Sequence, residues 1–237
     1  MKVYQKSFGS TKVFLRSNSP DERVATDNLG DEFAFVTDLL ASSAKPKLVL
    51  DLGGYIGTAA IAFATRIPNC TVISLEPSPD NFRMLLLNTA DYPNIVPVYA
   101  AIGGARRTAK VLARHTGAWG HTLVENPRDC AAPREVGLAQ VLTIPDVIAE
   151  YSREGQRAPA LVKIDIEGSE VELLRDPLWL ASWPIVLAEL HDRITPGCTE
   201  AWNASVLAHP SREEVADSGE KRISINPGLL RELHRGE

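Results

Sequence analysis

Acidic side chains end several short apolar runs of this 237-residue sequence. The residues at or just past the ends of these runs are Asp51, Glu76, Asp165 with Glu167, and Glu189 with His191. Ligands of open α/β sheets sit beyond the carboxyl ends of the strands, so residues in such places are the first to consider. Carboxylates accept hydrogen bonds from hydroxyl and ammonium groups, and an imidazole exchanges protons near neutral pH. The pattern predicts a polar ligand site with an acid or a base of its own.

A glycine-rich loop follows the first run, where Gly53, Gly54 and Gly57 precede an alanine-rich stretch. Glycines let the backbone approach a ligand closely and turn tightly into a helix, whose N-terminus favours a carboxylate or a phosphate. The dinucleotide fingerprint would need glycines at 53, 55 and 58, but the sequence has Tyr55 and Thr58. This spacing argues against NAD.

Two of the acids narrow the ligand further. Asp51 would sit awkwardly beside a pyrophosphate, but it suits a ligand that carries ammonium and sulfonium charges, and S-adenosylmethionine is such a ligand. Glu76 ends the second run, where its two oxygens could accept both hydroxyls of a ribose. That geometry is shared by NAD and S-adenosylmethionine sites. Glu76 therefore predicts a nucleoside without choosing between them.

The elements that must position these residues alternate between strands and helices. The hydrophobic patterns predict strands at 47–51, 71–76, 95–100, 160–165 and 184–190. They predict helices at 58–66, 81–90 and 168–175, and within 141–151 after Pro145. Such a rhythm favours right-handed βαβ crossovers. We therefore expect an α/β fold with a mainly parallel sheet and helices on both faces.

Three segments lie outside this rhythm. Residues 103–140 are interpreted as an insertion near the active face of a cofactor-binding core, 46–192. Residues 1–45 are expected to cover the sheet as an N-terminal lid, and 193–237 form a C-terminal segment. No linker-like composition separates them, so the whole chain, 1–237, is expected to fold as one domain. Short elements are predicted within these segments: a β-like piece at 109–113, a helix at 32–40, and one last strand at the sheet edge at 222–225.

The composition is that of a soluble folded protein, with 44% hydrophobic and 23% charged residues. The net charge of −5 gives no general attraction to nucleic acid or anionic lipid, so neither is an expected partner, and nothing points to an oligomeric state. No export signal and no uninterrupted apolar stretch of about 18 residues is present, so no membrane span is expected. The three cysteines are widely separated and form no CxxC pair, which fits a reducing cytoplasm and predicts neither disulfides nor a zinc site.

Three motifs together resemble the FkbM family of S-adenosylmethionine-dependent methyltransferases: VLDLGGYIG at 49–57, SLEP at 74–77 and LVKIDIEGSE at 161–170. The third motif is the most specific. The resemblance covers roughly residues 45–192. It is reinforced by Asn88, by Ala100-Ala101-Ile102-Gly103 and by Glu189-Leu190-His191.

The resemblance implies a class I methyltransferase sheet, Rossmann-like and seven-stranded with a reversed final hairpin. It also implies methyl transfer from S-adenosylmethionine to a hydroxyl of a small molecule, a sugar or a natural product, with S-adenosylhomocysteine as the second product. The chain departs from the family at Gly54-Tyr55, where the family usually has Ala-Asn, so the contact expected from that asparagine is missing. The expected cofactor-binding residues are Asp51, Gly53, Gly54, Tyr55, Gly57, Glu76, Pro77, Ala101, Ile102 and Asp165.

The acceptor chemistry is assigned to Asp165, Glu167 and His191. A positioned methyl donor needs little further help, but the proton of the acceptor hydroxyl must be removed by a base or made more acidic by a metal ion. His191 is the expected base because neutral imidazole is available near pH 7. Asp165 and Glu167 are expected to position the hydroxyl or the cofactor's ammonium, and His121 is the reserve base. The alternative for His191 is a strand-end histidine that is merely hydrogen-bonded beside Asp192.

Other interpretations stay open at this point. A divalent metal ion on Asp165, Glu167 and Glu189 is an alternative that the sequence does not favour, because carboxylates at sheet ends need no metal to be explained. A nucleotide-dependent oxidoreductase is disfavoured by the loop spacing and by Asp51. A non-catalytic nucleoside-binding module would keep the pocket without turnover. Among the four tryptophans, only Trp119 is expected to serve as a substrate platform.

Overall fold

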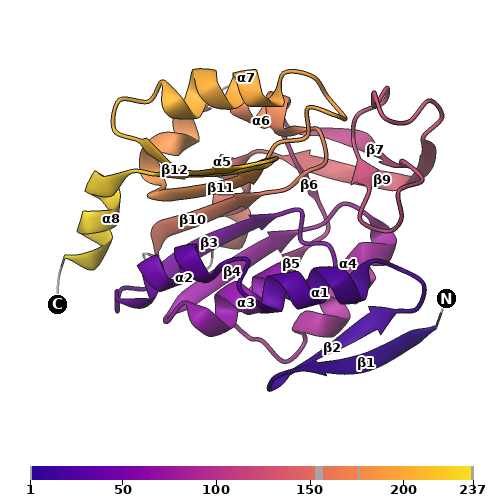
Figure 1. Cartoon of the computed structure of the whole chain (residues 1–237), viewed down its shortest axis with the longest axis horizontal. Helices are drawn as coiled ribbons and strands as arrows, with labels where there is room; N and C mark the ends of the chain where they lie inside the picture. The colour runs from indigo at the N-terminus through magenta and orange to yellow at the C-terminus, as the bar shows by residue number, and fades with distance from the viewer. Residues whose placement is uncertain (1, 153–156, 176, 236–237) are drawn as a thin grey trace.

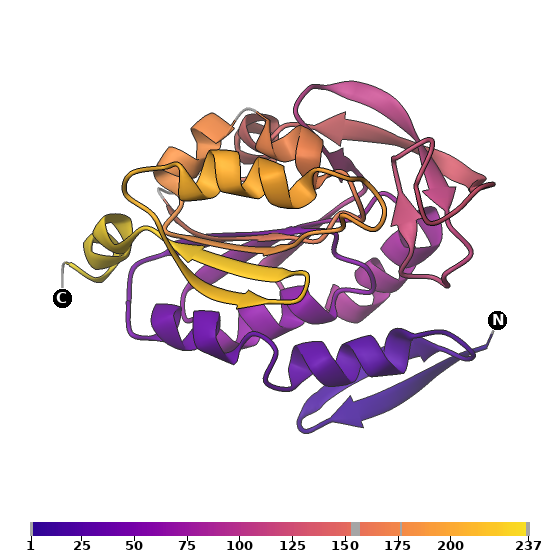
Figure 2. The same cartoon turned by 45° about the horizontal axis from the view of Figure 1, so that its top comes forward.

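The computed structural model describes residues 2–152, 157–175 and 177–235 and has a central sheet between two layers of helices (Figures 1 and 2). The sheet has seven strands in the order β12-β13-β11-β10-β3-β4-β5. Neighbours from β11 to β5 pair in parallel, whereas β13 is antiparallel to both β11 and β12. This order and the reversed final hairpin confirm the predicted class I methyltransferase sheet. The strands are β3 (Lys47–Leu52), β4 (Cys70–Leu75), β5 (Ile95–Val98), β10 (Ala158–Ile164), β11 (Ile185–Glu189), β12 (Glu213–Ser218) and β13 (Lys221–Ile225).

Helices cover both faces of the sheet, as Figure 2 shows. One face carries α1 (Asp21–Leu29), α2 (Ala34–Ala41), α3 (Thr58–Arg66) and α4 (Pro79–Thr89). The other carries α5 (Ile144–Tyr151), α6 (Glu170–Leu174), a short 3₁₀ helix (Pro177–Ser182), and α7 (Cys198–Trp202) with the π-helical turn that continues it (Asn203–Leu207). The last helix, α8 (Pro227–His234), lies beside the C-terminus. In the described part of the chain, no helix combines the length and the hydropathy that a membrane crossing requires.

Two hydrophobic cores lie on either side of the sheet and are joined through its strands. All six residues of β3 are buried. Leu48, Leu50 and Leu52 enter the core beneath α5, α6 and α7, whereas Val49 enters the core beneath α2 and α3. Successive side chains of a strand point to opposite faces, so a strand covered on both sides must be apolar on both. This explains why the sheet centre appears in the sequence as continuous apolar runs.

The predicted insertion folds as a second sheet with the strand order β6-β9-β7-β8. Its strands are β6 (Ala101–Ile102), β7 (Arg107–Ala113), β8 (His121–Thr122) and β9 (Arg134–Leu142). The helix predicted after Pro145 within 141–151 is α5, which begins at Ile144, where Val141 and Leu142 have ended β9. The helix start is fixed by a capping box, in which the Thr143 side chain accepts from the Asp146 amide and Asp146 accepts from the Thr143 amide.

The N-terminal segment packs as a cover on the face of α3 and α4. It begins with a hairpin of β1 (Val3–Phe8) and β2 (Thr11–Arg16), followed by α1 and α2. The side chain of Asn88, at the end of α4, accepts a hydrogen bond from the Phe14 amide at 2.7 Å and donates to the Phe14 carbonyl at 3.1 Å. It also donates to the Ile56 carbonyl at 2.8 Å. One amide side chain thereby links the hairpin to the glycine-rich loop.

The C-terminal segment supplies two strands rather than one. The strand predicted at 222–225 exists as β13, but its predicted place at the sheet edge was wrong, because β12 pairs outside it. The sequence of β12, Glu213–Ser218, is charged and shows no apolar run. An edge strand tolerates charged residues, which also discourage pairing with another chain. The polar composition of β12 therefore explains why the hydrophobic pattern did not predict this strand.

Candidate active site

A cavity of about 680 Å³ lies where β3, β4, β10 and β11 end. Parts of the N-terminal segment, the inserted sheet and the C-terminal hairpin also line it. It therefore lies between the central sheet and the outer segments. Ten of the residues predicted for the site are among its lining: Gly53, Gly54, Tyr55, Glu76, Pro77, Ala101, Ile102, Asp165, Glu167 and His191. Asp51 and Gly57 are not.

The glycine-rich loop is held between the ends of two neighbouring strands. The amides of Gly53 and Gly54 both donate to the Leu75 carbonyl at the end of β4, at 3.1 and 2.8 Å. Gly53 has φ +89°, and a Cβ there would lie 1.8 Å from the Asp165 carbonyl oxygen at the end of β10. Gly57 also has a positive φ, +90°, where the loop enters α3. Glycine is required at 53 by both its backbone conformation and the lack of space.

Asp51 lies behind the loop and is fully buried. Its Oδ2 accepts a 2.7 Å hydrogen bond from Ser74 Oγ, and its Oδ1 lies 3.3 Å from Lys163 Nζ. Lys163 Nζ also donates to the Gly53 carbonyl at 2.8 Å and lies 3.3 Å from Asp165 Oδ2. Burial raises the pKa of Asp51. Asp51 thus acts on the cavity through Lys163.

Lys163 was given no role from the sequence, yet it joins the two acidic strand ends. Burial alone would lower its pKa, but the Asp165 and Asp51 carboxylates raise the pKa above its ordinary value. It therefore stays protonated and is shared between the two acids. The signal for this role was present in the sequence, since a lysine inside a continuously apolar strand needs a buried partner.

Glu76 directly follows β4 and is held by backbone amides. Its Oε2 accepts from the Tyr55 amide at 2.9 Å and its Oε1 from the Ser78 amide at 2.8 Å. Burial raises the pKa of Glu76 to about 7, although both of these hydrogen bonds act to lower it. The carboxylate is thus fixed in orientation on the cavity wall, as a group that binds a pair of hydroxyls must be.

Tyr55, which stands where the family usually has asparagine, has a left-handed backbone with φ +51°. Asparagine adopts this conformation more readily than tyrosine does. The Tyr55 hydroxyl donates to Asp21 Oδ1 at 2.5 Å, and Asp21 forms a buried ion pair with Arg16 at 2.9 Å. Arg16 in turn donates to Asn81 Oδ1 at 2.8 Å. This network ties the loop to the N-terminal segment, and the sequence gave no sign of the Arg16–Asp21 pair.

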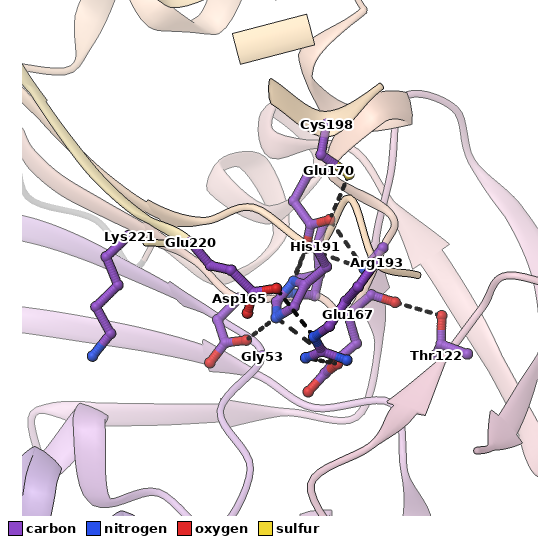
Figure 3. Close-up of polar contacts among 12 residues, drawn as sticks. Gly53, Thr122, Asp165, Glu167, Glu170, His191, Arg193, Cys198, Glu220 and Lys221 are labelled. Atoms are coloured by element: carbon purple, nitrogen blue, oxygen red, sulfur yellow. Dashed lines mark hydrogen bonds and ion pairs between the residues drawn. The ribbon is translucent and has the colours of Figure 1, made fainter. Parts of the chain in front are cut away.

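His191 lies between three carboxylates, as Figure 3 shows. Its Nδ1 is 2.9 Å from Glu170 Oε1, and its Nε2 is 3.9 Å from both Asp165 Oδ1 and Glu167 Oε2. Burial acts to lower the pKa of His191, but the Glu170 hydrogen bond and the surrounding carboxylates raise it to about 9. The imidazole is therefore protonated at pH 7 in the ligand-free protein. The premise that made His191 the expected base, a neutral ring, does not hold there.

Glu167, beside His191, has a pKa shifted toward neutrality. Burial and the Asp165 carboxylate raise the pKa to about 7, against the lowering effect of His191 and Arg114. Its carboxylate pairs with Arg114 and lies 3.7 Å from Arg193. Its backbone has φ +52°, and its carbonyl accepts a 2.6 Å hydrogen bond from Thr122 Oγ1 (Figure 3). The inserted sheet thus helps to hold the end of β10.

The insertion also contributes aromatic side chains to the cavity lining. Trp119 lines the cavity and is 38% exposed, with the Arg23 guanidinium 5.7 Å from its ring centroid. His121 lines the same cavity, and burial lowers the pKa of its ring. By contrast, Trp183 and Trp202 are fully buried in the core. Only Trp119 among these three tryptophans is placed to contact a ligand.

Residues 51–204, more than half of the chain, match the methyltransferase FkbM domain. The chain belongs to the FkbM methyltransferase family. This membership confirms the family predicted from the three motifs, and with it the class of S-adenosylmethionine-dependent methyltransferases and its cofactor. The identity of the acceptor, the roles of single residues and the cytoplasmic location stay predictions.

Named relatives are distant. The probable O-methyltransferase Rv1703c of Mycobacterium tuberculosis is 32% identical over 91 residues, which are 37% of this chain and 39% of that protein. The matched region therefore spans well under half of that relative's length. Among solved structures, an O-methyltransferase from Bacillus cereus in complex with SAH has a TM-score of 0.46 at 11% identity, with 89% of this chain and 83% of that chain covered. The C-terminal domain of precorrin-6Y C5,15-methyltransferase from Rhodobacter capsulatus has a TM-score of 0.43 at 14% identity, with 82% and 86% covered. The fold assignment therefore rests on the order and direction of the strands.

Proposed function

We propose that this chain transfers the methyl group of S-adenosylmethionine to a hydroxyl oxygen of a small molecule, a sugar or a natural-product intermediate. The observation that carries this proposal is the setting of Glu76. It is a buried carboxylate at the end of β4, oriented by two backbone amides, on the wall of a cavity that also includes the glycine-rich loop. In a member of this family, such a group is suited to accept the two hydroxyls of the cofactor's ribose.

The other carboxylates divide between cofactor and acceptor. Asp165 lines the cavity beside Gly53 and is ionised, since Lys163 and His191 hold its pKa below the ordinary value although burial opposes this. We assign it to the cofactor's ammonium group. Asp51 does not line the cavity, so we assign it to positioning Lys163 and, through it, the Gly53 carbonyl.

Glu167 and His191 would address the acceptor. When bound, S-adenosylmethionine supplies a methyl group that is already electrophilic, so the protein must orient the hydroxyl and take its proton. A general base works best when its pKa is near the working pH, and the pKa of Glu167 is about 7. We therefore assign the proton to Glu167, with the His191 imidazolium holding the negative charge in place. This reverses the order of the two residues expected from the sequence.

Calorimetric titration of the purified chain with S-adenosylmethionine and S-adenosylhomocysteine tests the cofactor site. Glu76→Gln should weaken both affinities at least tenfold, because an amide offers only one acceptor oxygen. Glu172→Gln is the matched control, since Glu172 pairs with Arg107 and does not line the cavity. Folded protein that binds neither ligand would refute the proposal.

Turnover separates an enzyme from a binding module. Methyl-labelled S-adenosylmethionine should pass its label to one or more members of a panel of sugars and hydroxylated natural products. Glu167→Gln should lower the turnover number by about 10²–10⁴-fold, the usual contribution of a general base. Cofactor binding without transfer to any acceptor would favour the non-catalytic interpretation, and binding of NAD in place of S-adenosylmethionine would favour the oxidoreductase.

A further inference from the structure

Three side chains with metal-binding atoms converge at one end of the cavity. Asp165 follows β10, Glu167 lies two residues further, and His191 follows β11. One donor atom from each lies within 4.8 Å of the other two, and Figure 3 shows the three side chains pointing toward one another. We propose that Asp165, Glu167 and His191 bind a divalent transition-metal ion. A histidine binds metal only as the neutral ring, so His191 would release its Nε2 proton, and Asp165 would then serve the ion in place of the cofactor's ammonium. The ion's role in catalysis rests on the proposed function, but its binding does not.

The distances fit a cation with little rearrangement. Around an octahedral ion with bonds of about 2.1 Å, adjacent donor atoms lie about 3 Å apart and opposite ones about 4.2 Å apart. His191 Nε2 lies 3.9 Å from Asp165 Oδ1 and 3.9 Å from Glu167 Oε2. These two separations lie between the two ideal values. Small movements of the two carboxylates, including one of Glu167 Oε2 away from Arg114, would bring the three atoms onto one ion.

The orientation of His191 is an independent observation that points to a ligand. The side chain is almost fully buried, and no hydrogen bond to its Nε2 is present among the described residues, although Nε2 faces the two carboxylates. Its Nδ1 is held at 2.9 Å by Glu170, which is itself fully buried. A carboxylate on one ring nitrogen is the arrangement that orients a histidine for metal binding through the other.

Glu170 is fixed for this role from several sides. Its Oε2 accepts from the Gly168 amide at 3.0 Å and from Cys198 Sγ at 3.3 Å, and its Oε1 accepts from the Ile166 amide at 3.2 Å. The sequence-based alternative for a metal site used Glu189 as the third residue. In the structure His191 takes that place, while Glu189 and Glu220 form a second group with His191 within metal-binding distance.

The cations next to the two carboxylates are each shared with another acid. Lys163, next to Asp165, is shared with Asp51. Arg114 and Arg193, next to Glu167, are both shared with Asp129. A divalent cation here would take the place of the proton on His191.

The donor set also indicates which ion. One imidazole nitrogen with two carboxylates suits Mn²⁺, Fe²⁺ or Zn²⁺ better than Mg²⁺, which prefers oxygen ligands alone. A cation here would lower the pKa of an acceptor hydroxyl beside it. The second carboxylate oxygen of Glu167 would then suffice to take the released proton.

Titration of the chelator-treated full chain with Mn²⁺, followed by calorimetry and by electron paramagnetic resonance of free Mn²⁺, tests the site. We expect one Mn²⁺ per chain. His191→Gln and Glu167→Gln should each weaken the affinity at least tenfold, and Glu170→Gln should weaken it about 10- to 100-fold by releasing the ring. His121→Gln is the matched control, since His121 lines the same cavity without belonging to the cluster, and it should leave the Mn²⁺ affinity unchanged.

Titration of the same samples with S-adenosylhomocysteine keeps the two proposals apart. If the unchanged protein binds S-adenosylhomocysteine but no Mn²⁺, the metal site is refuted and the proposed function stands. If it binds Mn²⁺ but no S-adenosylhomocysteine, the reverse holds. Mn²⁺ affinity that falls equally in His121→Gln, or that does not fall in Glu167→Gln, would also refute the site. Glu167 lies on the cavity wall, so its variant decides the question even if Glu170→Gln does not fold.

Discussion

Replacing Gly54 with alanine, the residue usual in the family, should disturb the same hydrogen bond as replacing Ser74 with alanine. A Cβ on Gly54 would lie 2.2 Å from Ser74 Oγ, and its next contact, with Asp51 Oδ2, would be an ordinary 3.5 Å. Gly54 is not among the described residues with positive φ, so alanine itself is not strained there. The serine hydroxyl must rotate away and lose its 2.7 Å hydrogen bond to Asp51.

The magnitude follows from that single bond. A hydrogen bond to a charged group contributes about 1.5–3 kcal/mol, and Ser74→Ala should lower the free energy of unfolding by that amount. Gly54→Ala should lower it similarly, less about 0.4–1 kcal/mol gained because alanine restricts the unfolded chain. Since the bond can be lost only once, the double variant should be no less stable than Ser74→Ala. The coupling energy between the two sites should therefore be about 1.5–3 kcal/mol.

Urea unfolding of the two single variants and the double variant measures this coupling. Ser74→Ala combined with Gly219→Ala is the control, because a Cβ on Gly219 meets nothing within 4 Å, and those two effects should add. If the losses in Gly54→Ala and Ser74→Ala also add, the methyl group does not compete with the hydroxyl. The account of why this chain has glycine at 54 would then be wrong.

Three other measurements address the loop, the ribose site and the buried histidine. In urea unfolding, Gly53→Ala should lower the free energy of unfolding at least twice as much as Gly219→Ala. Both positions have positive φ, which costs alanine about 1–2 kcal/mol, but only at 53 would the Cβ also meet backbone, 1.8 Å from the Asp165 oxygen. Equal losses would contradict this close approach. The affinity for S-adenosylhomocysteine should rise as the pH passes through about 7, since only ionised Glu76 accepts both ribose hydroxyls. Titrations at pH 6 and pH 8 check this, and the affinity of Glu76→Gln should not depend on pH in that range. The free energy of unfolding of the ligand-free protein should fall by about 3 kcal/mol between pH 6.5 and 9, because the pKa of His191 is about 9 in the folded protein and lower in the unfolded chain. His191→Gln should flatten that part of the pH profile. An unchanged slope in this variant would contradict the protonation of His191 in the folded protein.

The centre of the fold was predictable because its elements carry local signals. A strand covered on both faces must be apolar throughout, and 47–52 is apolar apart from its lysine and aspartate. The helix predicted at 58–66 has the bounds of α3, because the glycine loop ends there and the alanine-rich stretch begins. The inserted sheet and β12 lack such signals. β7 is stabilised by pairing with β9 across the rest of the insertion, and β12 by pairing with β13. The outer faces of these strands are free to be polar.

The site was predictable to the extent that topology alone places it. The carboxyl ends of parallel strands meet at one edge, so Glu76, Asp165 and His191 could be grouped without knowing any contact. What could not be predicted depends on pairs that are distant in sequence. Arg114 meets Glu167 across 53 positions. The protonation of His191 follows from a buried Glu170, and neither residue type nor spacing reveals burial.

The two sides of the cavity therefore have different origins in the sequence. The proposed cofactor side is built from contiguous motifs at the strand ends. The proposed acceptor side also includes the outer segments, which supply Trp119 from the insertion and the ion pair between Glu32 of the N-terminal segment and Lys221 of β13. Both members of that pair line the cavity, so it links the two ends of the chain at the ligand site. Substitutions in the insertion and the C-terminal hairpin can reshape the acceptor pocket while the backbone amides that hold Glu76 stay in place. We therefore expect exchange of the insertion or the C-terminal hairpin between relatives to change the acceptor without changing the affinity for S-adenosylhomocysteine. Exchange of residues 1–45 should also weaken that affinity, because it removes the contact of Asp21 with Tyr55, whose amide holds Glu76.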